Sequence, residues 1–175
     1  MKPREITIHM TSDTINVSAD TLWTLVGPGF ADVGAWTTSV DKSFAVGTPQ
    51  LEGAPCNERE CHVNISGYDK MIETLTLFDA DSRQIAYEVT EGVPGFVLLA
   101  RNHWTIREVG PGRSVAEMAC TMRLSAWAGL FLGGTMKRTV ARNLKEVFQE
   151  LKVYAETGDT SAQKKSRLRA LSLAG

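Results

Sequence analysis

The sequence lacks the usual marks of a membrane-spanning, secreted or nucleic-acid-binding protein. Its 175 residues contain no apolar run of membrane-spanning length, and the first residues lack the apolar core of a signal peptide. Three cysteines are an odd number, which excludes a complete disulfide framework and favours reduced thiols. A net charge of −1 gives no reason to expect nucleic acid or an anionic membrane as the main partner. We therefore expect a single cytoplasmic domain that does not insert into a membrane.

The sequence is also poor in motifs of cofactor-dependent or triad chemistry. It shows no phosphate-binding loop, dinucleotide fingerprint or Ser-His-Asp order. Cys56 precedes the pair Cys61 and His62, but this spacing is not a standard zinc pattern and no second cluster supplies further ligands. We therefore expect neither a metal nor another cofactor.

The dominant element is one long amphipathic segment, from Gly129 to Thr157. Apolar residues recur there at steps of three and four, which predicts a helix with one buried face. Gly158 follows the last periodic residue and suits a left-handed helix cap. At about 1.5 Å per residue the helix would be roughly 40 Å long. Such a helix, in a chain otherwise full of strands, needs a sheet that curves around it.

Strand-like runs joined by turn residues make up most of the remaining chain. Short connections imply antiparallel neighbours, because parallel crossovers need far more chain. Between the first two strands, residues 18–26 and 30–36 predict two short helices. The prediction is an α+β domain over residues 1–158, with a solvated basic tail at 159–175. The predicted strands are residues 5–17, 40–46, 58–65, 71–78, 84–90, 98–108 and 114–125.

Several short motifs stand in a characteristic order before the long helix. They are Trp23 in the first helical segment, Trp36 near the end of the second, Arg59 opening a strand, Glu73 with Leu75, and Arg83 with Tyr87. In order and spacing, residues 7–157 resemble the START/Bet v 1-like helix-grip superfamily, especially its polyketide cyclase/dehydrase-like branch. The resemblance implies a curved antiparallel sheet of about seven strands, wrapped around a long C-terminal helix. It also implies a cavity for an apolar small molecule between sheet and helix.

Strand alternation indicates which side chains reach such a cavity. In the last two strands it turns Asn102, Trp104 and alternate apolar residues inward, while residues 58–65 leave both parities open. The resemblance favours an inward Glu73. Asn102 and Trp104, and the long loop at 47–57, depart from the family pattern and point to an altered pocket shape. The predicted ligand-binding residues are Trp36, Arg59, Glu73, Tyr87, Asn102, Trp104, Met118, Cys120, Met122, Met136, Val140 and Leu144.

Two polar residues are candidates for chemistry. Glu73, if surrounded by apolar side chains, would gain proton affinity through desolvation and act as a general acid or base. The alternatives are an ion pair with Arg59 or a place on the solvent side of its strand. Asn102 suits orienting a ligand carbonyl, or forms a structural hydrogen bond to a neighbouring loop.

Three functional hypotheses follow, because the superfamily includes lipid carriers, hormone receptors, cyclases and dehydratases. The first is a binding protein for a hydrophobic or aromatic molecule, lipid or polyketide-like. The second is a cofactor-free cyclase or dehydratase that uses Glu73. The third is a non-catalytic interaction or stress-response domain with a filled cavity. We expect a monomer or homodimer, in which the apolar residues 130–132 could form the dimer surface.

Overall fold

A computed structural model describes residues 2–65 and 68–174 of the chain. Seven antiparallel strands form one curved sheet in the order β1-β7-β6-β5-β4-β3-β2. Strands β2 to β7 are a continuous meander, and β1 pairs with β7 to form the edge strand opposite β2. The predicted sheet of about seven antiparallel strands is thereby confirmed. The strands are β1 (Arg4–Thr11), β2 (Val40–Val46), β3 (Glu58–Ile65), β4 (Tyr68–Asp79), β5 (Gln84–Glu91), β6 (Val97–Gly110) and β7 (Arg113–Leu124).

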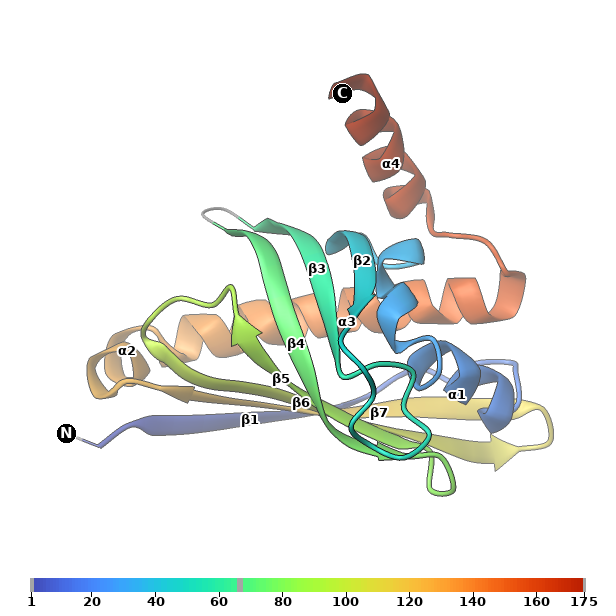
Figure 1. Cartoon of the computed structure of the whole chain (residues 1–175), viewed down its shortest axis with the longest axis horizontal. Helices are drawn as coiled ribbons and strands as arrows, with labels where there is room; N and C mark the ends of the chain where they lie inside the picture. Colours follow the sequence, from blue (N-terminus) through green and yellow to red (C-terminus); the bar gives the residue numbers. More distant parts are fainter. Residues whose placement is uncertain (1, 66–67, 175) are drawn as a thin grey trace.

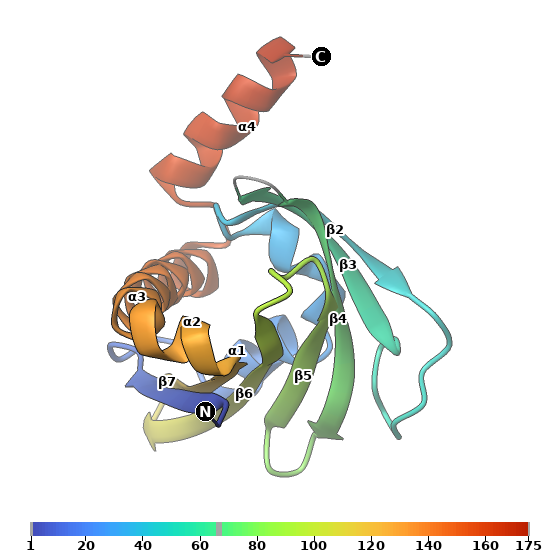
Figure 2. The same cartoon turned by 90° about the vertical axis from the view of Figure 1, so that its left-hand side faces the viewer.

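The concave side of this sheet holds the long helix, as Figure 2 shows in end view. Two short helices lie between the first two strands and cover one end of the sheet (Figure 1). This arrangement confirms the helix-grip fold. The helices are α1 (Ala19–Val26), the 3-10 helix η1 (Phe30–Ala35), α2 (Ala126–Phe131), α3 (Gly133–Thr157) and α4 (Ala162–Ala174).

Local signals in the sequence explain two helix ends. The Ser18 hydroxyl accepts a hydrogen bond from the Thr21 backbone N–H at 3.1 Å, and so caps the first turn of α1. Gly158 ends α3 with a φ of 70°, in the left-handed region that glycine adopts without steric cost. Its N–H donates to the carbonyl of Tyr154 at 2.8 Å. The cap at Gly158 was predicted from the sequence.

The first predicted strand and the predicted long helix differ most from the elements found. The first strand ends at Thr11 rather than at Val17, and beyond it Ile15 forms only an isolated bridge with Ser114. The long helix is interrupted at Leu132, which separates α2 from α3. Residues 66 and 67, where the sequence predicts a turn, lie outside the described residues.

The C-terminal tail is a helix rather than a solvated extension. Helix α4 leaves the body of the domain, but its first turns are anchored (Figure 1). Lys164 is completely buried, and its Nζ donates to the carbonyl of Val40 at 2.6 Å. Arg167 forms a two-pronged ion pair with Asp41 on β2. The tail is therefore attached to the edge of the sheet. Within the described chain, no helix is long and apolar enough to cross a membrane.

Candidate functional site

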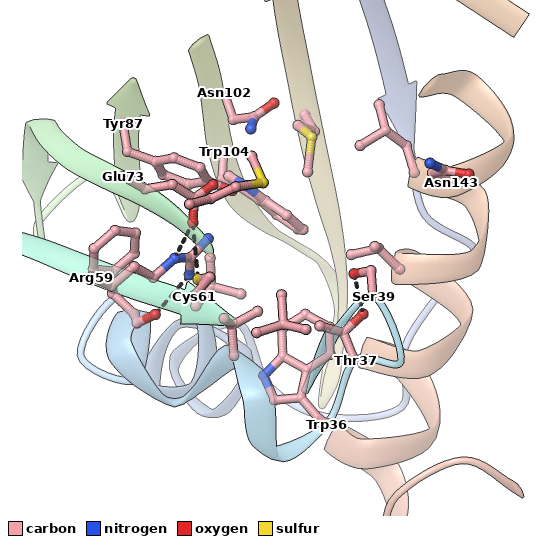
Figure 3. A pocket seen from close by; sticks show the side chains of 18 of the residues that line it. Trp36, Thr37, Ser39, Arg59, Cys61, Glu73, Tyr87, Asn102, Trp104 and Asn143 are labelled. Atoms are coloured by element: carbon pink, nitrogen blue, oxygen red, sulfur yellow. Dashed lines mark hydrogen bonds and ion pairs between the residues drawn. The ribbon is translucent and has the colours of Figure 1, made fainter. Parts of the chain in front are cut away.

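A cavity of about 280 Å³ lies between the inner face of the sheet, η1 and α3 (Figure 3). Its wall is largely apolar, and the polar side chains on the sheet are Arg59 on β3, Glu73 on β4, Tyr87 on β5 and Asn102 on β6. Ten of the twelve predicted ligand-binding residues contribute to the wall. These ten are Trp36, Arg59, Glu73, Tyr87, Asn102, Trp104, Met118, Cys120, Val140 and Leu144.

The other two predicted residues lie beyond the cavity. Met122 is buried two residues further along β7, where it pairs in register with Ile6 and Ala100. Met136 is partly buried in the first turn of α3 and packs against the core. Neither residue lines the cavity, because strand and helix periodicity gives the buried face but not the length of the cavity along it.

Arg59 and Glu73 form an ion pair within the cavity wall. They face each other in the register of β3 and β4, and Arg59 Nε donates to Glu73 Oε2 at 2.5 Å. Arg59 Nη1 also donates to the carbonyl of Phe30 at 2.7 Å. The guanidinium carbon lies 4.2 Å from the ring centroid of Phe30 and 4.7 Å from that of Tyr87. Both aromatic rings therefore contribute cation–π contacts to the buried charge.

The electrostatics of the pair favour a permanently charged Arg59. Burial alone would lower the pKa of Arg59, but the carboxylate of Glu73 outweighs it and the pKa is raised. Of the alternatives open for Glu73, the ion pair with Arg59 is the arrangement found. Oε2 of Glu73 also accepts a hydrogen bond from the Cys61 thiol at 3.4 Å. Oε1 has no hydrogen-bond partner among the described residues, and the Glu73 side chain lines the cavity.

The thiols of the two cysteines in the wall are not activated as nucleophiles. Burial raises the pKa of Cys61 to about 12 and that of Cys120 to about 11. Since only the thiolate is a strong nucleophile, neither thiol is activated near neutral pH. The cysteines therefore contribute small apolar surface to the cavity.

Tyr87, Trp104 and Asn102 form the polar side of the cavity opposite α3. The Trp104 indole N–H donates to the Tyr87 hydroxyl at 3.2 Å, and burial raises the pKa of Tyr87 to about 12. Tyr87 consequently keeps its proton and can donate it in a hydrogen bond. Asn102 Oδ1 is buried and has no partner among the described residues. An unpaired buried acceptor costs free energy unless something else binds it.

The side of the cavity near Thr37 and Ser39 is fixed by a residue that sequence reasoning missed. The carboxylate of Glu150 on α3 is buried and accepts hydrogen bonds from Thr37, from both the backbone and side chain of Thr38, and from Ser161. One signal was available: Glu150 stands three residues after Val147, within the apolar stripe of the helix. A charged residue in such a stripe requires buried partners.

The residues considered for a metal do not gather into a site. His62 is exposed and contacts Glu60 at 3.0 Å on the outer face, whereas Cys61 points inward. In residues 2–65 and 68–174, no three His, Cys, Asp or Glu side chains are placed to hold a metal ion together.

Comparison with known proteins gives a family and a set of structural neighbours. The family described as "Polyketide cyclase / dehydrase and lipid transport" matches residues 7–156. No curated protein matches the chain significantly.

Solved structures with the same fold include two enzymes and one protein designated Ara h 8.0201. The Zhui aromatase/cyclase from Streptomyces sp. R1128 is 15% identical, with a TM-score of 0.63 over 90% of this chain and 100% of the other. Norcoclaurine synthase from Thalictrum flavum, in complex with dopamine and hydroxybenzaldehyde, is 14% identical. Its TM-score is 0.61, over 86% of this chain and 87% of the other. Ara h 8.0201 is 12% identical, with a TM-score of 0.66 over 87% of this chain and 98% of the other. At these identities, the likeness shows the fold alone.

The family match spans most of the folded domain, from β1 to the end of α3. It covers the elements that surround the cavity, and the fold of the neighbouring structures agrees with it. The chain is therefore a member of the polyketide cyclase/dehydrase and lipid transport family.

Proposed function

We propose that the protein binds a small aromatic molecule that carries a hydroxyl group, in the cavity between the sheet and α3. The observation that carries this proposal is Asn102 Oδ1, a buried acceptor that has no partner among the described residues and lies in a largely apolar wall. Ligand pockets typically combine apolar surface with a few polar groups that orient the ligand. A ligand hydroxyl would satisfy Asn102 Oδ1, and the Tyr87 hydroxyl would donate to a second ligand oxygen.

The volume of the cavity supports a ligand rather than a filled core. Trp104 and Met118 are buried at its wall, yet about 280 Å³ remains open between them and α3. Close-packed protein interiors rarely leave voids much larger than a water molecule. This volume weighs against the hypothesis of an interaction domain whose cavity is filled by its own side chains.

A catalytic role is the second candidate, and the unpartnered Oε1 of Glu73 favours it. With Arg59 as its counter-ion, the Glu73 carboxylate suits a general base that removes a proton, which is one of the two roles expected from the sequence. The relatives with this fold include an aromatase/cyclase and a synthase bound to two hydroxylated aromatic molecules. Turnover of an aromatic polyketide-like substrate by the wild type, unchanged in Glu73→Gln, would eliminate this role.

Asn102→Leu tests the proposed orientation of the ligand. The variant removes the acceptor but keeps side-chain size, so the affinity for hydroxylated aromatic ligands should fall about tenfold, the value of one hydrogen bond. The affinity for the corresponding hydrocarbons, which cannot donate to Asn102, should stay the same or increase. Isothermal titration of matched ligand pairs, with and without the hydroxyl group, measures the difference.

A control for this experiment is Asn143→Leu. Asn143 also lines the cavity, but it is an exposed residue of α3, where water can satisfy its amide. This variant should bind each ligand of a pair with the same affinity as the wild type does. An equal loss of affinity for both ligands in Asn102→Leu would show that Asn102 shapes the wall without recognising a hydroxyl group.

A further inference from the structure

Helix α2 presents its large side chains to solvent and its small ones to the protein. Ala128 is fully buried and Gly129 is also buried, while Trp127, Leu130 and Phe131 are 52%, 61% and 74% exposed. The spacing of the three exposed residues places them on one face of the helix. A helix of a monomeric soluble protein normally buries such a face. Here the three side chains form an exposed apolar surface. The helix that carries them lies at the end of the domain, next to β1 (Figure 2).

This orientation is fixed by the packing of α2 on β1. Arg4 Nη1 donates to the carbonyl of Gly129 at 3.1 Å. A Cβ atom at position 129 would lie 2.5 Å from the Cβ of Arg4, so only glycine permits the close approach. Phe96, in the loop between β5 and β6, packs edge-on against Trp127 at 5.6 Å between ring centroids. The helix therefore cannot turn its apolar face inward without losing these contacts.

Basic residues are concentrated in the part of the chain that carries this apolar surface and in the helix that follows it. Residues 118–145 contain five basic residues and no acidic residue, although the whole chain has a net charge of −1. Four of these lie in the first half of α3 with exposed side chains, and within the described chain none of the four forms an ion pair. They are Lys137, Arg138, Arg142 and Lys145.

We propose that α2 and the start of α3 dock the protein peripherally on an anionic lipid bilayer. Trp127, Leu130 and Phe131 would enter the headgroup region, where tryptophan is favoured because its ring is apolar and its N–H is polar. The basic residues of α3 would contact anionic headgroups, which attract such segments within a Debye length. Apolar side chains beside unpaired lysine and arginine are the composition of interfacial membrane anchors.

The same charge argues against a homodimer through this surface. A two-fold interface brings the same patch of both copies together, so the basic stretch of α3 would approach itself without acidic partners. Anionic headgroups supply the complementary charge that a second copy lacks. The net charge of −1 averages over the whole chain and conceals this local concentration of basic residues, so net charge alone does not indicate an anionic membrane.

Vesicle flotation of the full chain tests the proposal. The vesicles are phosphatidylcholine alone, and phosphatidylcholine mixed with phosphatidylglycerol. The variants are Leu130→Ser/Phe131→Ser, which removes apolar area, and Arg138→Gln/Arg142→Gln, which removes charge. Leu173→Ser is the matched control, because Leu173 is an apolar side chain of α4 with 89% exposure. Ligand binding in the cavity and sizing chromatography are measured on the same samples.

We expect the wild type and Leu173→Ser to float with the mixed vesicles, and to bind phosphatidylcholine more than about tenfold more weakly. Both double variants should lose more than about tenfold in binding to mixed vesicles, with cavity binding unchanged. High salt should weaken the binding of the wild type to the mixed vesicles. The proposal is overturned if no vesicle binds the wild type, or if the double variants bind as the wild type does. It is equally overturned if the wild type is a dimer that Leu130→Ser/Phe131→Ser dissociates.

Discussion

Replacing Arg59 by methionine is expected to lower the free energy of unfolding by about 3–5 kcal/mol, the usual cost of breaking a buried ion pair. The variant leaves the carboxylate of Glu73 without its counter-ion in a wall that is closed to solvent. It also leaves the carbonyl of Phe30 without a hydrogen-bond donor. Chemical denaturation, followed by far-UV circular dichroism, measures the change.

The matched control is Arg101→Met on the outer face of the sheet. Arg101 pairs with Glu88 across β5 and β6, but its side chain is 49% exposed, so the loss should stay below about 1 kcal/mol. The double variant Arg59→Met/Glu73→Leu should recover much of the lost stability, because two apolar residues replace a charge pair. If the double variant is no more stable than Arg59→Met, the stranded charge is not the cause.

Replacing Glu150 by alanine is expected to cost about 2–4 kcal/mol, since a buried carboxylate with several donors is lost at once. Its four hydrogen bonds connect α3 to Thr37 and Thr38 at the cavity rim and to Ser161 at the start of α4. The variant should therefore loosen the rim and α4 together. Denaturation gives the stability, and amide hydrogen exchange shows which segments open.

Glu146→Ala is the control for this variant, because Glu146 stands one turn earlier on α3 with its side chain exposed. Its effect should stay within about 0.5 kcal/mol. Faster exchange confined to α3 in Glu150→Ala, with the rim and the start of α4 unchanged, would contradict the proposed connection.

The sheet could be predicted closely because its turns and strands carry strong local signals. The segment at 40–46 matches β2 and that at 58–65 matches β3, since both are bounded by turn residues. Helix α4 was missed for a physical reason as well. Its apolar residues do not form one stripe, and it is held by a buried lysine and an ion pair that only the tertiary structure supplies.

The partner of Glu73 could not be derived from the strand pattern alone. Ile65 pairs with Tyr68, and in a regular hairpin with that pairing Arg59 would face Thr74. A bulge between His62 and Ile65 shifts the register by one residue, and this shift brings Arg59 opposite Glu73. The alternation of side chains along a sequence does not reveal such bulges. A one-residue shift in register nevertheless changes which residues of two neighbouring strands face each other. The ion pair was therefore one alternative among several.

Native mass spectrometry of Val140→Trp tests whether the cavity is the ligand site. Val140 lines the cavity from α3, so a tryptophan there would occupy the space of the ligand. Val153→Trp is the control, because Val153 lies on the same helix but is exposed. A thermal unfolding curve of each variant confirms folding, since overpacking costs about 1–3 kcal/mol.

Wild type, Val140→Trp and Val153→Trp are each mixed with one panel of hydroxylated aromatic molecules. We expect one-to-one complexes with the wild type and Val153→Trp, and none with folded Val140→Trp. Complexes of equal abundance with all three proteins would contradict this expectation, because the ligand would then bind outside the cavity between the sheet and α3.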